Sequence, residues 1–175
     1  ASLTLQFWKN SGYQFSFTDT FMQQSTEQPT FYIDVLKDSP PSLSIVKPGM
    51  NTTLSPTQIE TLWVEAFDDY GIKQLALHYR VSSLNPDTQL SIDLSPLKTK
   101  QSVQRSYIWD IHPLQLYPDD TVFYWAQTRD NKPFGNPQIA TSDTFWFRLP
   151  SFAEIHKKIA ENENTTESTL QSVTD

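Results

Sequence analysis

The sequence predicts an all-β protein: a β-sandwich of about seven short strands, preceded by a β ribbon and followed by one helix. Three observations lead to this prediction. Short runs of alternating apolar and polar residues, separated by turn residues, recur up to Pro150. No helical pattern interrupts these runs. One block of sequence occurs twice, at a spacing typical of a single sandwich domain.

The repeated block is an aromatic segment, a polar loop and a second aromatic segment. The first copy starts at Tyr13 and resumes over residues 29–35 after its loop. The second copy starts at Tyr124 and resumes over residues 143–149. Tyr13 and Tyr124 are 111 positions apart, and an immunoglobulin-like sandwich has roughly 100 residues. The spacing therefore indicates a slice of a tandem array.

Three parts follow from this interpretation. Residues 1–37 are expected to be the C-terminal strands of a preceding module. Residues 38–150 are expected to be a complete sandwich. Residues 151–175 are expected to begin a helical or coiled-coil segment.

The first part contains three strand-like runs: Leu3–Trp8, Tyr13–Phe17 and Thr30–Leu36. A ribbon of two or three strands is marginally stable alone, because one of its faces has no core to cover it. Exposed strand edges also pair readily with a second copy. We therefore expect contacts between modules or between proteins, with a homodimer through residues 1–37 as one form.

The second part contains seven strand-like runs: Leu43–Val46, Ile59–Phe67, Leu75–Val81, Gln89–Leu94, Ser106–Ile111, Val122–Thr128 and Thr144–Leu149. A turn is expected at Asp68–Gly71. Alternation with a period of two places nine residues in the core. They are Leu62, Val64, Ala66, Leu75, Leu77, Tyr79, Val122, Tyr124 and Ala126.

The spacing of Tyr124 in the sixth run is that of a tyrosine corner, in which the hydroxyl group bonds to the backbone upstream. Ala126 then stands where antibody domains have their second cysteine, and Ala66 is a candidate for the first. This pattern favours an immunoglobulin-like or fibronectin III-like sandwich whose sheets are held by packing instead of a disulfide. A plain core aromatic is the alternative for Tyr124.

The third part has helical spacing of Phe152, Ile155 and Ile159. Ser151 is a candidate N-cap, and Glu154 stands at the capping-box position. No proline or glycine occurs from Phe152 to Val173, so the helix is expected to extend far into the tail. Its thin apolar stripe fits the start of a coiled coil or a frayed end.

Composition argues against several classes of function. The formal net charge of −7 at pH 7 repels nucleic acid and anionic lipid. Cysteine is absent, so disulfides and thiolate metal sites are excluded. No apolar run approaches the ~20 residues of a membrane-spanning helix, so contact with a membrane is expected only through segments outside this chain.

Two stretches resemble bacterial sequences. Residues 64–72, Val-Glu-Ala-Phe-Asp-Asp-Tyr-Gly-Ile, are similar to an element of bacterial immunoglobulin-like repeats. The run from Tyr107-Ile108-Trp109-Asp110 through Pro118-Asp119-Asp120 to Leu149-Pro150-Ser151 resembles a bacterial family of unknown function. Members of that family are large proteins with N-terminal membrane helices, immunoglobulin-like modules and a long coiled coil. Over about residues 12–160 the resemblance implies an extracytoplasmic place, in the periplasm or on the cell surface.

The resemblance supplies no catalytic residues, and its usual Pro-Gly-Asp turn reads Pro118-Asp119-Asp120 here. The chain also lacks nucleophile-elbow, P-loop, dinucleotide and zinc-protease motifs. Each of the three histidines, His78, His112 and His156, lacks a second ligand at short spacing. We therefore predict that the chain is not an enzyme. We also predict that it has no bound cofactor, with one bound metal ion as the exception to test.

That exception is calcium. In an immunoglobulin-like sandwich the loops after the second and sixth strands lie at the same end, so Asp68, Asp69 and Asp130 are expected to converge there. Asp38 in the linker could approach them. Ca²⁺ takes six to eight oxygen ligands. The alternative is that these aspartates form turns through hydrogen bonds to nearby backbone amides.

The predicted function is that of a non-catalytic structural or interaction module of a large bacterial envelope protein, serving as a spacer in a tandem array. The alternative is an adhesive or carbohydrate-binding module. Trp63 and Phe67 share one strand face, and Trp125 points opposite to Tyr124. Exposed rings gathered into one patch would favour the alternative, whereas buried rings would favour the spacer.

Overall fold

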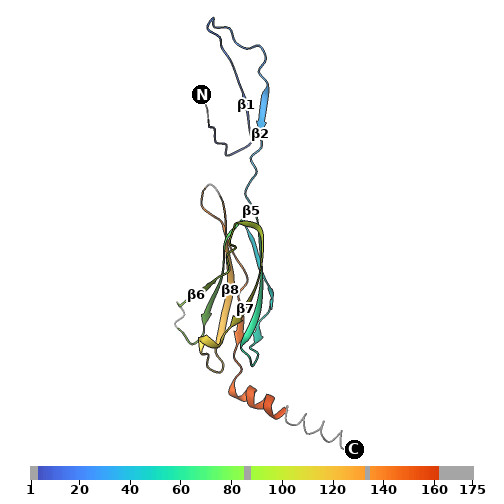
Figure 1. Ribbon diagram of the computed structural model, residues 1–175, viewed down its shortest axis with the longest axis vertical. Helices are drawn as coiled ribbons and strands as arrows, with labels where there is room; N and C mark the ends of the chain where they lie inside the picture. The colour runs from blue at the N-terminus through green and yellow to red at the C-terminus, as the bar shows by residue number, and fades with distance from the viewer. Residues whose placement is uncertain (1–3, 85–87, 133–134, 162–175) are drawn as a thin grey trace, which may run out of the picture. The chain divides into compact units, whose positions relative to one another are not determined.

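The computed structural model describes residues 4–84, 88–132 and 135–161. The chain divides into two compact units, residues 1–38 and 39–175. The first unit holds a two-stranded antiparallel ribbon, and the second holds a larger β structure followed by a helix (Figure 1). The predicted all-β fold with a leading ribbon and a C-terminal helix is confirmed.

The ribbon consists of β1 (Ser11–Gln14) and β2 (Thr30–Ile33). The predicted strand at Leu3–Trp8 is wrong for its described residues 4–8, which have no strand partner. The other two predicted strands, Tyr13–Phe17 and Thr30–Leu36, extend further than the observed ones. Pairing between β1 and β2 stops at Gln14 and at Ile33.

An aromatic cluster covers one face of the ribbon. The ring of Tyr13 stacks on Phe31 at 5.3 Å between centroids and meets Phe15 edge-on at 5.4 Å. Phe15 is 50% exposed and Phe31 is 44% exposed. The rings therefore bury one another only in part, because the described residues of this unit form a single two-stranded sheet.

The ribbon repeats the register of the last hairpin of the second unit, between β8 (Thr121–Asp130) and β10 (Phe145–Arg148). Tyr13 lies opposite Phe31 in the ribbon. Its counterpart in the repeat, Tyr124, lies opposite Phe145. The two copies of the repeated block thus form the same strand pair in the same register.

The second unit contains the remaining elements. They are β3 (Ser42–Lys47), β4 (Thr52–Thr53), β5 (Ile59–Val81), β6 (Leu90–Asp93), β7 (Lys100–Asp110), a 3-10 turn η1 (His112–Leu114), β8, β9 (Ile139–Thr141), β10 and a helix described over residues 152–161.

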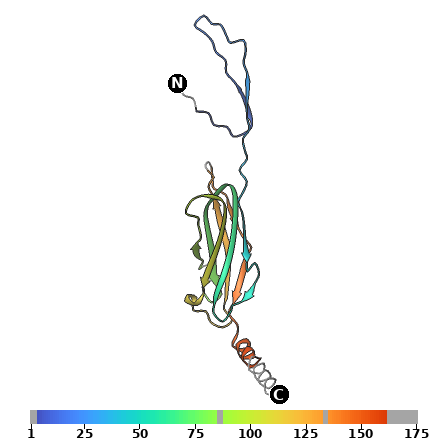
Figure 2. The same cartoon turned by 45° about the vertical axis from the view of Figure 1, so that its right-hand side comes forward.

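Strand β5 takes part in both layers of the sandwich. Its first half, residues 59–67, pairs with β3 and β7. Its second half, residues 72–81, pairs with β6 and β8, and β8 pairs in turn with β9 and β10. Short β4 completes the second layer through parallel pairing with β10. Figures 1 and 2 show the layers packed face to face.

The strand limits differ from prediction at two places. The expected turn at Asp68–Gly71 is a bend within continuous β5, marked by shifts in register on both sides of Ile72. Strand β7 begins at Lys100 instead of Ser106. Its polar first residues carry no apolar pattern, so their pairing with β5 is invisible to hydrophobic periodicity.

The core lies between the two layers. Eight of the nine predicted core residues are buried, and the ninth, Tyr79, is half-buried and packs against them. Trp109, which the core prediction omitted, is 3% exposed. Its ring meets Tyr124 edge-on at 6.0 Å, and Tyr124 stacks on Phe147 at 4.5 Å. Aromatic rings thus supply much of the core volume.

The predicted hydrogen bond of the tyrosine corner is not formed in the part of the chain that the structure describes. The hydroxyl group of Tyr124 is fully buried and has no hydrogen-bond partner among the described residues. Burial accordingly raises the pKa of Tyr124, and the negative charge of Glu60 raises it further. Tyr124 is therefore a core aromatic, the alternative reading of its position.

At the end of the sandwich where the chain leaves, Asp119 has a φ of 73°. This left-handed conformation favours glycine, so Asp119 occupies the position that the resembling family fills with glycine. The buried carboxylate of Asp120 is hydrogen-bonded. Its Oδ2 accepts bonds from Ser83 Oγ at 2.9 Å and from Tyr117 N–H at 2.8 Å.

The predicted capping box is formed. Ser151 N–H donates to Glu154 Oε2 at 2.8 Å, and Glu154 N–H donates to Ser151 Oγ at 3.2 Å. Arg148 of β10 adds two bonds to the Glu154 carboxylate, at 3.0 and 2.7 Å. The last strand thereby holds the first turn of the helix. The rest of the predicted helix, residues 162–173, lies outside the described residues.

Tyr124→Phe should not destabilise the sandwich. The change removes a buried hydroxyl group that has no partner, so we expect between no effect and a gain of about 1 kcal/mol in the free energy of unfolding. Urea denaturation monitored by tryptophan fluorescence measures it. A decrease of about 1 kcal/mol or more in the free energy of unfolding would instead indicate that the Tyr124 hydroxyl group makes the corner hydrogen bond.

Glu154 should titrate far below an ordinary glutamate. The bonds from Arg148, followed by that from Ser151 N–H, lower the pKa of Glu154 from 4.5 to about 2. The capping contacts should thus be fully present above pH 4.5 and be lost as the pH falls through about 2. A carboxyl ¹³C NMR titration checks this, with Glu154→Gln identifying the signal. A midpoint near 4.5 would contradict the ion pair.

Candidate metal centre

The bend of β5 is built around the side chain of Asp68. Its Oδ2 accepts backbone bonds from Tyr70 N–H at 3.0 Å and from Gly71 N–H at 2.6 Å. Gly71 has a φ of 113°, which an L side chain rarely adopts. An aspartate followed three residues later by a glycine therefore suits a sharp change of strand direction here.

Asp130 ends β8 at the same end of the sandwich, where it lies opposite Ile72 of β5. Its Oδ1 accepts bonds from Lys132 N–H at 3.3 Å and from Gln138 N–H at 2.9 Å. Asp19, its counterpart in the first copy of the repeat, likewise accepts from the N–H two residues on, that of Phe21, at 2.8 Å. One oxygen of Asp130 thus stabilises the turn after β8. This agrees with the alternative in the sequence analysis, in which the aspartates form turns.

The second oxygen of each carboxylate has no such role. Asp68 is 1% exposed and Asp130 is 0% exposed. Asp68 Oδ1 and Asp130 Oδ2 are both buried without a hydrogen-bond partner among the described residues. Burying an unpaired carboxylate oxygen is costly, so turn formation accounts for only half of each side chain.

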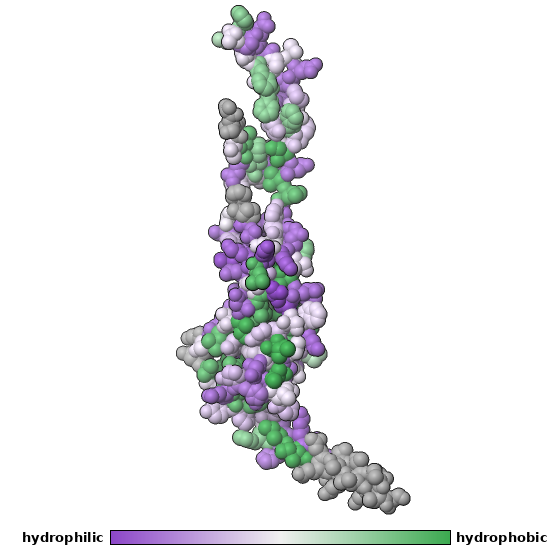
Figure 3. All heavy atoms as spheres, viewed as in Figure 1, coloured by the Kyte–Doolittle hydropathy of each residue, from purple (hydrophilic) through white to green (hydrophobic). Residues whose placement is uncertain are grey.

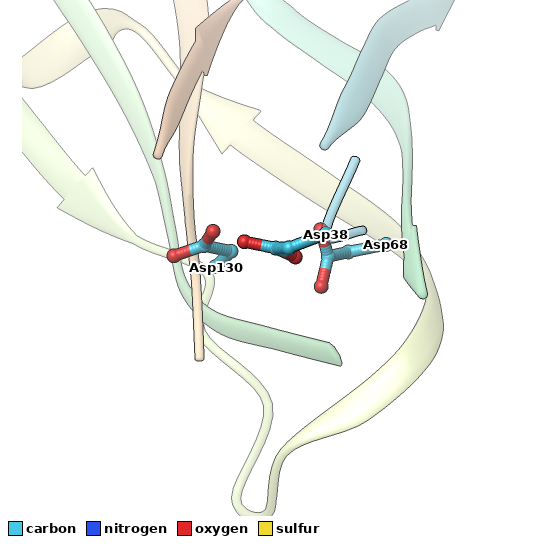
Figure 4. A group of neighbouring side chains, drawn as sticks. All are labelled: Asp38, Asp68 and Asp130. Carbon is cyan, nitrogen blue, oxygen red and sulfur yellow. The ribbon is translucent and has the colours of Figure 1, made fainter. Parts of the chain in front are cut away.

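A third carboxylate, that of Asp38, joins these two. One oxygen from each of Asp38, Asp68 and Asp130 lies within 4.8 Å of the others. Figure 4 shows the three carboxyl groups gathered side by side. Asp38 directly precedes Ser39, whose N–H donates to Asp69 Oδ2 at 3.3 Å. This bond holds the start of the sandwich next to the bend.

Asp69, which the sequence analysis placed in the site, is not a member of this close group. Its Oδ2 accepts the Ser39 bond, and its backbone carbonyl accepts Gln101 Nε2 at 2.6 Å. The structure thus brings Asp68 and Asp130 together with Asp38. Neighbouring residues on a strand point to opposite faces. This alternation in the sequence could have shown that Asp68 and Asp69 do not point into the same site.

The electrostatics reflect this crowding. Burial raises the pKa of Asp68, the bonds from Gly71 and Tyr70 lower it, and the charges of Asp69 and Asp130 raise it again. The net shift is upward. Converging negative charge is therefore only partly offset by the backbone N–H groups, and an added positive charge would be favourable here.

Other candidate residues lie elsewhere. His78 lines a groove of about 450 Å³ on the outer surface of β5, β6, β8 and β9. Its ring stacks on Trp125, its Nδ1 is bonded to Gln89 at 2.8 Å, and burial lowers its pKa. His112 Nδ1 contacts the Asp110 carboxylate at 2.8 Å on the surface, so the prediction that His112 lacks a second ligand at short spacing is wrong. The ring of His78 is thus packed against a neighbouring ring, whereas the ring of His112 lies at the surface.

Comparison with known proteins supplies no assignment. The chain matches no family model, and no curated protein sequence matches it. In the part of the chain that the structure describes, no helix is long and apolar enough to cross a membrane. A functional proposal therefore rests on the residues of the chain and their geometry.

Gly71→Ala should destabilise the sandwich by about 2 kcal/mol or more. A Cβ at this position would lie 2.6 Å from Thr99 Cγ2, in addition to the strain of the positive φ. Gly135→Ala is the control, because its φ is 86° but the nearest atom is 3.9 Å away. Chemical denaturation should show the larger loss for Gly71→Ala, and equal losses would contradict the close approach.

Proposed function

We propose that this chain is a non-catalytic structural module of a large bacterial envelope protein and works as a load-bearing spacer in a tandem array of immunoglobulin-like domains. The observation that carries the proposal is the course of the chain through the sandwich. The chain enters at one end and leaves at the opposite end.

The strand registers define these two ends. Ser42, the first residue of β3, pairs with Phe67 next to the bend. Arg148, the last residue of β10, pairs with Thr121, which begins β8. Since β8 runs from Thr121 to Asp130 beside the bend, entrance and exit lie a full strand length apart. Modules of this kind join end to end with little change of direction.

The pairing between β4 and β10 in the second layer also suits a module that resists stretching. Thr52 and Thr53 of β4 pair in parallel with Phe147 and Arg148 of β10. Leu54 N–H donates to the Arg148 carbonyl at 2.9 Å. A pull on the two chain ends drags these strands in opposite directions along their length. The bonds between them are then loaded together instead of one after another.

The ribbon supports the array. Its strands share the register of β8 and β10, and Asp19 accepts a turn bond like that of Asp130. In the sandwich the ring of Tyr124 is fully buried, whereas its counterpart Tyr13 in the ribbon is only half-buried. The ribbon therefore has the form of a last hairpin that needs the other strands of a module to cover it.

The placement in a bacterial envelope is the part of the proposal that rests on resemblance. It comes from residues 64–72 and from the longer run ending at Ser151. The acidic composition is compatible with it, since a net charge of −7 disfavours binding to nucleic acid and anionic lipid.

Single-molecule stretching tests the spacer. Handles at Ser39 and Pro150 should unfold the sandwich in one event, with a gain in length of about 3.5 Å per released residue. The control attaches handles at Ser83 and Pro150, both at the exit end, so that β10 is peeled away bond by bond. We expect the end-to-end direction to need the higher force. Equal forces, or stepwise yielding at low force, would contradict a load-bearing role.

The adhesive alternative has one favourable observation. Trp63 is 42% exposed and Phe67 is 56% exposed on the outer face of the first layer, with Glu65 between them. Glu65 interrupts the apolar surface between these two rings. Hydrophobic and hydrophilic residues are also interspersed on the one face of the molecule that Figure 3 draws. Binding to a glycan array that Trp63→Ala abolishes would favour this alternative over the spacer.

A further inference from the structure

The end of the sandwich at the β5 bend concentrates negative charge beyond what its turns require. Asp68 Oδ2 and Asp130 Oδ1 each accept two backbone bonds, and these bonds account for the turns. Their other oxygens, Asp68 Oδ1 and Asp130 Oδ2, are buried without a partner among the described residues. One carboxylate oxygen of Asp68 and one of Asp130 lie within 4.8 Å of each other.

We propose that Asp68 and Asp130 bind a calcium ion at this end of the sandwich. The inference is independent of the spacer function, because it concerns only the chemistry of these two carboxylates. Nothing in it requires that the module bear load or belong to an array.

The donor set selects the class of ligand. Carboxylate oxygens are the ligands of hard cations, and the group contains no nitrogen or sulfur donor that would favour zinc or copper. Bound calcium would place a positive charge next to the two unpaired oxygens. The turn bonds on the opposite oxygens would hold both carboxylates in position before the ion arrives.

The choice of calcium over magnesium follows from the shape of the site. Ca²⁺ takes six to eight oxygens in flexible geometry at 2.3–2.6 Å, whereas Mg²⁺ demands a near-ideal octahedron and keeps most of its water. The carboxylates of Asp68 and Asp130 are fixed by two separate turns, and not by one regular loop (Figure 4). Water and further oxygens would complete an irregular shell around Ca²⁺ more readily than an octahedron around Mg²⁺.

The test titrates calcium chloride into the whole chain after treatment with a chelator. Extracellular modules bind Ca²⁺ with dissociation constants of about 10⁻⁴ to 10⁻³ M. At 5 mM calcium the melting temperature should therefore rise by about 5 °C relative to chelator. Calorimetry should show saturable binding, and 5 mM magnesium should give a clearly smaller rise.

The decisive variants are Asp68→Asn and Asp130→Asn. An asparagine oxygen can keep accepting the backbone bonds of the turn, so each variant replaces only the oxygen proposed as a ligand. We expect calcium affinity to fall at least about 10-fold. In chelator both variants should be as stable as the parent chain or more stable, because one of the crowded charges has been removed.

Asp93→Asn is the matched control. Asp93 Oδ1 accepts Ser95 N–H at 2.9 Å in a surface turn of the same sandwich. This variant makes the same chemical change outside the site and should keep the full calcium response. A flat titration of the parent chain overturns the proposal. An equal response to magnesium, or an undiminished response in both site variants, overturns it as well.

Discussion

The bend of β5 at Asp68–Gly71 is the constraint on which the sandwich depends. One strand supplies residues 59–67 to the first layer and residues 72–81 to the second. The change of direction needs a glycine with a φ of 113° and a carboxylate that receives two N–H groups. Without it the two apolar faces of β5 would not meet across one core.

The same bend creates the site at this end. Because Asp68 must point inward to accept the two N–H groups, its second oxygen is buried as well. The second layer then brings Asp130 alongside through the pairing of Ile72 with Asp130. The stability of the bend and the crowding of the carboxylates are thus two consequences of one local geometry, and a cation would relieve the second without disturbing the first.

The opposite end is organised by different chemistry. Arg148 lies between the carboxylates of Asp119 and Glu154 and bonds to both. Here opposite charges are paired at the surface, and the capping box directs the chain into the helix. One end of the sandwich therefore buries two carboxylate oxygens, of Asp68 and Asp130, that have no partner among the described residues. The other end fixes the direction in which the chain leaves.

The sequence by itself determined the fold class, the core and the helix start, because period-two alternation and the pair Ser151 and Glu154 are local signals. It also located Asp68 and Asp130 at one end. Tertiary structure decided the rest. The hydroxyl of Tyr124 found no partner among the described residues, and β7 extended back to Lys100. Each of these depends on which residues approach across the layers, and no local pattern encodes that.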